Sequence, residues 1–362
     1  MKKRFASIMG LALIAILAFT GCAKPAETTP ATGETPAAEA FKFDRKIELV
    51  CPWGAGGGAD TTLRAFASAL EKEVGVPVVV NNVEGGGGVQ GSEYTYKQPA
   101  DGYTYMIGTQ SLILVNIQKL MSFDYVAEFV PVTRLVHDTN ILVASSKAPY
   151  KNFKELIEYI KANPGKVKVG VLTITGVDAF MVKQTFELAG VDVPMIAFNN
   201  GAELNAAIIG GHIDLSVAGP AESKGLIESG DMIGIVAAAE TRLSMLPDVE
   251  TTTEQGIESL LGPMRGIFAK KGTPDEAIKA FEAAAEKAVA SAEFQDWAKA
   301  TSLDQRPGYA NAADFQAIWT EQNTVLTELY TKYVTKQSTA DWLLMLMLER
   351  GGQVLPRFFK DF

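Results

Sequence analysis

A short apolar run followed at once by a cluster of glycines constrains the fold of this chain more than any other feature. Residues 47–51 are predicted to form a β-strand that breaks at Pro52, and glycine occupies four of the five positions from 54 to 58. A helix is predicted over 60–74, because its apolar side chains recur every three or four residues. Glycine lets main-chain N–H groups approach a ligand closely, in front of the positive end of the helix dipole. The turn is therefore predicted to bind an anion through Gly54, Ala55, Gly56, Gly57, Gly58, Asp60 and Thr61.

Two further loops follow predicted strands of the same block. Residues 85–88 form a second glycine run after a strand predicted at 76–80, and residues 107–111 end a strand predicted at 103–108. Loops at the carboxyl ends of strands in an open α/β sheet meet in one crevice. Contacts to the same anion are therefore predicted from Gly87, Gly88, Thr109, Gln110 and Ser111. The hydroxyls of Thr109 and Ser111 have an alternative, which is to bond their own backbone.

Predicted strands and helices alternate from residue 41 onward, which is typical of an α/β fold. The first block also contains a short helix at about 90–97, and Asn152, with Glu155 three residues on, marks the start of a helix that leads into a second block. The later elements of that block are a strand at 167–172, a helix at 178–189, a strand at 193–198, a helix at 202–209 and strands at 213–217 and 233–238. Two helices follow, one at 312–333 and one at 273–290 behind a capping box of Thr273 and Glu276. The pattern predicts two α/β lobes closed by helices.

The N-terminal residues differ in composition from the rest of the chain. Residues 1–21 have a basic start and an apolar stretch, which is the layout of a secretory signal. The small residues before Cys22 resemble a bacterial lipoprotein box, so Cys22 is predicted to carry a lipid that holds the protein at the membrane. Residues 22–40 contain mainly Ala, Pro, Thr and Glu and are predicted to form a disordered tether. With Cys22 committed to lipid, Cys51 has no partner for a disulfide within the chain.

The net charge of the chain limits the classes of partner that it can bind. The formal net charge is −9, and loss of residues 1–21, with three basic and no acidic residues, makes it −12. Binding to nucleic acid depends on Lys and Arg that neutralise phosphates, so no nucleic-acid partner is predicted. An anionic ligand has to be held by local dipoles against the overall negative field.

Several polar residues have both a functional and a structural interpretation. Asp60 could contact a ligand, but it stands where a helix N-cap is expected. Arg134 and Arg265 could each clamp a carboxylate through two parallel hydrogen bonds, or be solvated at the surface. His137 and His212 are the only histidines, and no nucleophile or metal-ligand set can be assembled around them. The sequence therefore predicts neither catalysis nor a metal or other cofactor.

Seven segments, in order, carry a resemblance to a known family. They are CPWGAGGGADTTLR, VPVVVNNVEGGGGVQG, PADGYTYMIGTQS, FVPVT, KANPGKVKVG, GGHIDL and LPDVETTTEQG. Over about 41–334 the chain resembles the Bug-type solute-binding proteins of tripartite tricarboxylate transporters. The resemblance implies a two-lobed type II periplasmic-binding fold, the "Venus flytrap". Lobe 1 would comprise 41–143 with 264–337, lobe 2 would comprise 144–263, and crossing strands would lie near 141–144 and 263–268, leaving 338–362 as an extension of unknown role.

The resemblance also implies a site and a function. In such receptors one carboxylate is held by the first glycine loop and a loop of the second lobe, mainly through backbone N–H groups and ordered water. The implied function is a monomeric, non-enzymatic receptor, lipid-anchored outside the cytoplasm, that delivers a di- or tricarboxylate or related organic acid to its permease. The second-lobe contacts would come from Thr173, Thr175, Gly176, Asn199, Asn200 and Gly201.

The chain departs from the family pattern at two places that bear on the ligand. Ala179 stands where a His is common, and Met264, beside Arg265, replaces the usual Trp. Asp178 also adds a negative charge to the second loop. These departures leave the identity of the carboxylate open.

The alternative function is a dinucleotide-binding oxidoreductase. Gly54, Gly56 and Ala59 fit G-x-G-x-x-A between a strand and a helix, and Glu84 follows the next strand as a ribose acceptor would. The export signal, the Pro52-Trp53 pair and the second glycine run favour the receptor instead.

Overall fold

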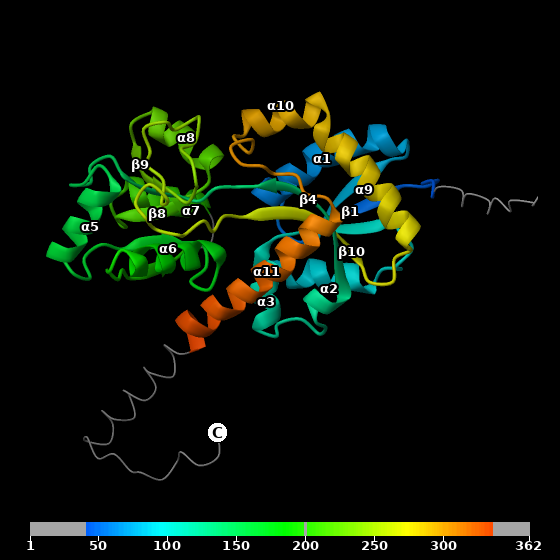
Figure 1. Cartoon of the computed structure of the whole chain (residues 1–362), viewed down its shortest axis with the longest axis horizontal. Helices are drawn as coiled ribbons and strands as arrows, with labels where there is room; N and C mark the ends of the chain where they lie inside the picture. The colour runs from blue at the N-terminus through cyan, green and yellow to red at the C-terminus, as the bar shows by residue number, and fades with distance from the viewer. Residues whose placement is uncertain (1–40, 199–200, 336–362) are drawn as a thin grey trace, which may run out of the picture. The chain divides into compact units, whose positions relative to one another are not determined.

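The structure is a computed structural model that describes residues 41–198 and 201–335 (Figure 1). The predicted signal and tether, the extension at 338–362, and Asn199 and Asn200 lie outside these ranges. The described residues belong to a compact unit that spans Ala40–Phe362. The strands of this unit form two five-stranded sheets.

The first sheet has the strand order β2-β1-β3-β10-β4. Its strands are β1 (Ile47–Cys51), β2 (Val78–Asn82), β3 (Thr104–Gly108), β4 (Phe129–His137) and β10 (Met264–Lys270). β1 runs parallel to β2 and β3, whereas β10 is antiparallel to β3 and β4. The chain therefore returns to this sheet after it has formed the second one.

Helices cover both faces of the first sheet, because its strands are apolar on both sides. Leu49 and Tyr105 pack into one core, and Met106 and Phe268, next to them in register, pack into the other. The core of Leu49 and Tyr105 includes α1 (Gly58–Val74), α9 (Asp275–Ala290) and α10 (Ala292–Ala300). The core of Met106 and Phe268 includes α3 (Gln110–Ile117), α4 (Tyr125–Glu128) and α11 (Ala312–Tyr330). Figure 1 shows α1, α9 and α10 on the opposite side of β1 and β10 from α3 and α11. The helix α2 (Val89–Lys97) contacts β1 and β3.

The second sheet has the strand order β7-β6-β8-β5-β9. Its strands are β5 (Ile141–Ser145), β6 (Val169–Val171), β7 (Met195–Ala197), β8 (Leu215–Ala218) and β9 (Met232–Ala237). β6 is parallel to β7 and β8, and β5 is antiparallel to β8 and β9. Its helices are α5 (Phe153–Ala162), α6 (Val177–Leu188), α7 (Gly201–Ile209) and α8 (Pro220–Glu228).

Two segments carry the chain between the sheets. Residues 138–140 join β4 of the first sheet to β5 of the second, and residues 238–263 lead from β9 back to β10. The first of these segments is only three residues long. The two sheets are thus joined directly at the ends of β4 and β10, which lie side by side.

Helix starts test the sequence predictions in detail. The helix start predicted at Asn152 is confirmed: Asn152 Oδ1 accepts the Glu155 N–H at 2.9 Å, and Glu155 Oε2 accepts the N–H of Lys151, the residue before the cap, at 2.7 Å. The capping box predicted for α9 is wrong, because the Thr273 hydroxyl instead donates to the Lys270 carbonyl at 2.8 Å. Pro274 occupies the N-cap position there, with no side-chain hydrogen bond.

Two further observations bear on the predictions for the whole chain. Of the helices in the described ranges, none combines the length and apolarity that crossing a bilayer requires. Cys51 is a free, fully buried thiol in β1, and burial raises its pKa to about 11.

Candidate functional site

A cavity of about 540 Å³, here called the cleft, is lined by loops of both sheets. Its size is typical of a site for a small ligand. Lining residues from the first-sheet elements include Trp53, Gly57, Gly58, Gly87, Thr109, Gln110, Ser111 and Arg265. Lining residues from the junction and the second-sheet elements include Asp138, Asn140, Leu172, Thr173, Thr175, Gly176 and Asp178. The structure therefore brings three predicted loops of the first block to the same cavity as the predicted loop at 173–178.

The N-terminus of α1 opens onto the cleft at Gly57 and Gly58. Gly57 is the N-cap residue and no side chain caps this helix end, so the first N–H groups of the helix have no side-chain acceptor where its first residues line the cavity. Asp60, the predicted N-cap, is the third residue of the helix and is 2% exposed. Its carboxylate accepts the Gly56 N–H at 2.8 Å and the Asn82 amide at 2.9 Å, which shapes the turn.

The Asp60 carboxylate makes its hydrogen bonds within the turn and does not line the cleft. Burial alone would raise the pKa of Asp60, but hydrogen bonds from Arg64, the Gly56 N–H and Asn82 lower it below its ordinary value. Asp60 is absent from the cavity lining. Its carboxylate therefore positions the glycine turn.

The N-terminus of α6 opens onto the same cleft from the second sheet. Gly176 is its N-cap, again with no side-chain cap, and the Gly176 N–H closes a turn to the Thr173 carbonyl at 3.0 Å. Asp178 stands in the first turn of α6 and accepts the Asn140 amide at 3.0 Å. Two helix N-termini therefore share one cavity, and each carries a partial positive charge.

Two residues at the start of α3 that were predicted to contact the ligand make hydrogen bonds within the protein. The Thr109 hydroxyl accepts the Ser111 N–H at 3.2 Å as the N-cap of α3. The Gln110 amide, 1% exposed, donates to the Gly262 carbonyl at 2.9 Å and accepts the Met264 N–H at 2.8 Å. Gln110 therefore ties α3 to the segment that returns from the second sheet.

The remaining predicted site residues that the structure describes are not part of the cavity lining. They are Gly54, Ala55, Gly56, Thr61 and Gly88 of the first block, and Gly201, which begins α7. Thr61 donates its hydroxyl to the Gly57 carbonyl at 3.1 Å. Asn199 and Asn200 lie outside the described residues.

Of the two candidate arginines, only Arg265 lines the cleft. Arg134 donates to the carbonyls of Gly308 at 2.7 Å and Pro307 at 2.9 Å, and it is absent from the cleft lining. Arg265 lines the cleft, and its Nη2 forms an ion pair with Asp138 Oδ2 at 3.1 Å. Sequence reasoning missed Asp138 as a site residue, because its partner is 127 positions away.

The histidines take no part in the cleft lining. Burial, with Arg306 and Arg134 nearby, lowers the pKa of His137 to about 3, so this imidazole is neutral. His212 is exposed in the turn before β8. Within the described residues, no group of three His, Cys, Asp or Glu side chains is arranged to hold a metal ion.

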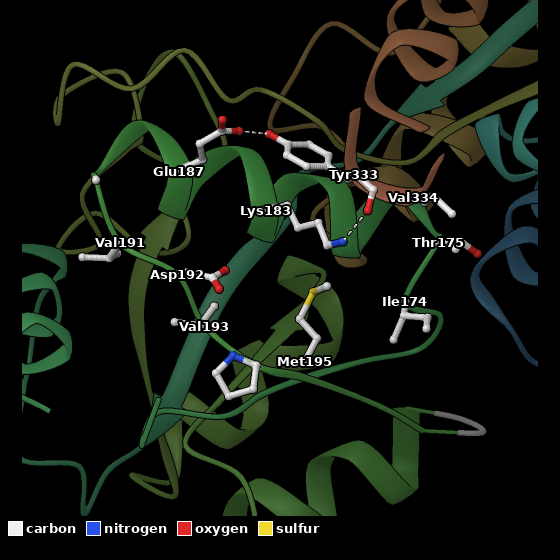
Figure 2. Close-up of a pocket in the computed structure, with 12 residues that line it drawn as sticks. Ile174, Thr175, Lys183, Glu187, Val191, Asp192, Val193, Met195, Tyr333 and Val334 are labelled. Carbon is white, nitrogen blue, oxygen red and sulfur yellow. Dashed lines mark hydrogen bonds between the residues drawn. The ribbon is translucent and has the colours of Figure 1, made fainter. Parts of the chain in front are cut away.

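A second cavity, of about 850 Å³, lies between α6 and the π-helical turn Thr331–Thr335 that follows α11 (Figure 2). Glu187, which lines it, pairs with Lys332 at 2.6 Å and accepts the Tyr333 hydroxyl. Lys183 donates to the Tyr333 carbonyl at 3.2 Å. This cavity lacks a helix N-terminus among its lining residues, so the cleft is the stronger candidate site.

Comparisons with known proteins agree on one family. The model of the tripartite tricarboxylate transporter family receptor matches residues 62–329. Protein BugT of Bordetella pertussis is 30% identical over 276 residues, which cover 74% of this chain and 80% of BugT.

Solved structures resemble the chain over most of its length. A TctC solute-binding protein from Polaromonas is 26% identical with a TM-score of 0.68, covering 80% of this chain and 98% of its own. Rpa4515 from Rhodopseudomonas palustris, solved with adipate, is 23% identical with a TM-score of 0.70, covering 79% and 96%. MatC from the same organism, solved with malate, is 21% identical with a TM-score of 0.67, covering 79% and 98%.

Proposed function

The chain belongs to the tripartite tricarboxylate transporter receptor family, and we propose that its cleft captures a small carboxylate for delivery to a transporter permease. Solved relatives confirm the predicted two-lobed periplasmic-binding fold. The observation that carries the proposal is the pair of uncapped helix N-termini, at Gly57 of α1 and Gly176 of α6, that open onto one cavity. Main-chain N–H groups at a helix N-terminus favour an anion without a formal positive charge.

The proposed ligand is a di- or tricarboxylate or a related organic acid. Support comes from two neighbours of the same fold, one solved with adipate and one with malate. We propose that the ligand contacts the predicted residues that line the cleft, which are Gly57, Gly58, Gly87, Thr109, Ser111, Thr173, Thr175 and Gly176. The matched family consists of receptors, so the dinucleotide-binding alternative gains no support from the comparisons.

Thermal unfolding with a panel of acids tests the proposal. Malate, succinate, adipate and citrate are compared with the neutral diamide of adipate, each at 10 mM, and the acid that stabilises the protein is then titrated by calorimetry. A ligand present at 100 times its Kd raises the free energy of unfolding by about 2.7 kcal/mol. We expect at least one acid to stabilise the protein and the diamide to have no effect. Stabilisation by none of the four acids contradicts the proposal.

We also propose that Cys22 anchors the receptor to the outer side of the cell membrane and that the receptor acts as a monomer. The support for anchoring is the basic, apolar and Thr-Gly-Cys order of residues 1–22. Several acyl chains on one cysteine hold a protein stably at a membrane, whereas one chain holds it marginally. Cys22→Ser should move the protein from the membrane fraction to the soluble fraction. Unchanged membrane association of this variant contradicts the anchor.

A further inference from the structure

We infer that Arg265 binds an anionic group of the ligand directly through its Nη1 atom. This inference rests on the proposed function, since it concerns the same cleft. Arg265 is the second residue of β10, where the chain enters the first sheet after its return from the second. Its side chain lines the cleft, although the residue is only 8% exposed.

The two terminal nitrogens of Arg265 differ in their partners. Nη2 donates to Asp138 Oδ2 at 3.1 Å, and the other oxygen of Asp138 accepts the Thr139 N–H at 2.8 Å. Nη1 is buried, and no hydrogen-bond acceptor for it lies among the described residues. A buried N–H of a charged group without an acceptor is costly, and such groups are rare in folded proteins. The guanidinium is therefore fixed in place by Asp138 with a donor still to be satisfied from the cleft.

The surroundings of Arg265 favour an anion as that acceptor. A Cβ atom added at Gly58 would lie 2.6 Å from Nη2, so the guanidinium sits against the first residue of α1. The positive end of the α1 dipole and the Arg265 charge therefore face the same part of the cleft. One negative group placed there interacts favourably with both.

Arg134 provides the comparison that separates a ligand contact from a structural arginine. The Arg134 residue is buried to the same degree as Arg265, each with 8% exposure. Yet it donates from Nε and Nη2 to two main-chain carbonyls of the segment before α11, and no atom of it is left buried without an acceptor. If Arg265 had a purely structural role, each of its buried donors should likewise have an acceptor within the protein. Nη1 of Arg265 has none among the described residues.

The consequence is that this receptor adds a formal charge to a site otherwise built from main-chain donors. A carboxylate can accept from Nη1 while it also accepts from the N-terminus of α1. Arg265 then sets which end of an asymmetric ligand lies against the first sheet. Its substitution should lower affinity for anions without altering the two sheets.

Calorimetry with malate, succinate, adipate and citrate tests this on the wild type, Arg265→Gln, Arg265→Lys and the control Arg45→Gln. The control removes the same charge from an exposed residue that pairs with Asp101 and is absent from the cleft lining. Loss of a hydrogen bond to a charged group weakens binding about 10- to 100-fold. We expect that loss for Arg265→Gln, a smaller loss for Arg265→Lys, and a change of less than about two-fold for Arg45→Gln.

A nuclear magnetic resonance measurement reports the contact itself. The guanidinium N–H resonances of Arg265, assigned by their absence in Arg265→Lys, should shift on addition of the acid that binds. This readout decides the matter even if Arg265→Gln does not fold. Unchanged affinity in folded Arg265→Gln, an equal loss in Arg45→Gln, or unshifted Arg265 resonances at saturation overturns the inference and leaves the carboxylate receptor intact. Failure of all four acids to bind the wild type overturns the proposed function instead.

Discussion

Gly57 and Gly58 are adjacent at the mouth of α1, but a methyl group meets different surroundings at each. At Gly57 the nearest atom to an added Cβ is the Gly54 carbonyl oxygen at 3.6 Å, an ordinary contact. At Gly58 it is Arg265 Nη2 at 2.6 Å, so the guanidinium has to move. Gly58→Ala should therefore weaken binding of the acid identified above about 10-fold, while Gly57→Ala stays within about two-fold. Calorimetry on both variants checks this, and equal effects would contradict it.

His137 links stability to pH. Its pKa is lowered to about 3, mainly by burial and further by Arg306 and Arg134, whereas an unfolded histidine has a pKa near 6.5. Between these values the unfolded state binds more protons, so stability is complete above pH 6.5 and is lost as the pH falls toward 3. From pH 7.5 to 5.5 this one group should lower the free energy of unfolding by roughly 1.4 kcal/mol.

Urea unfolding at the two pH values measures this contribution. His137→Gln should flatten the pH dependence, whereas His212→Gln, at an exposed position, should leave it unchanged. A slope that His137→Gln leaves unaltered would show that the pKa of His137 does not differ between the folded and unfolded states.

At the scale of elements, α3 holds the returning segment through one side chain. Gln110→Leu leaves the Gly262 carbonyl and the Met264 N–H without their partner in a buried position. Each unsatisfied group costs about 1–3 kcal/mol, so we expect a loss of roughly 2–4 kcal/mol in the free energy of unfolding. Gln118→Leu is the matched control, because its amide bonds only the Leu114 carbonyl within the same helix end. Chemical denaturation that finds equal losses in the two variants contradicts this role.

The elements that the sequence predicted well have clear boundaries. β1 was predicted at its observed bounds, because Pro52 and the glycines end its apolar run. The start of α5 followed from Asn152, whose cap is local chemistry. By contrast α3 was not predicted, because its residues QSLILVNI are apolar on nearly every side and give no helical period. α10 was not predicted, since only Ser291 separates it from α9.

The candidate site was predictable to the extent that it is local. The glycine turn before α1 and the loop before α6 carry their signal within a few residues, and both line the cleft. The Arg265 and Asp138 pair depends on how β10 lies beside β4, where Arg265 is opposite Val136. That register arises from packing of segments more than a hundred residues apart, so no spacing in the sequence reveals it.

At the scale of the whole molecule, the split of the site between two sheets predicts closure around the ligand. A ligand drives closure only as far as it binds the closed state better than the open one. Small-angle scattering should therefore show a smaller radius of gyration when the acid is bound. Thr175→Val, on the α6 side of the cleft, should weaken both binding and compaction. A radius of gyration that stays constant at saturation contradicts this mechanism.

A third link between the sheets bears on that motion. α11 packs on β4 of the first sheet, and the turn after it bonds Glu187 of α6 through Lys332 and through the Tyr333 hydroxyl. Figure 2 shows the bond between Tyr333 and Glu187. Closure that separates α6 from this turn has to break these contacts. Closure that preserves them has to rotate α6 about the end of α11.

The burial of Cys51 makes this protein suited to fluorescent labelling. A chain that begins at residue 41 contains Cys51 as its only cysteine. With a pKa of about 11, fewer than roughly one in a thousand of these thiols is ionised at neutral pH, and the thiolate is the form that reacts with maleimide dyes. Cysteines introduced at the exposed positions Glu73 on α1 and Lys161 on α5 can then carry a donor and an acceptor dye without removal of the native residue. Energy transfer between the two dyes would follow single receptors as they capture and release their acid.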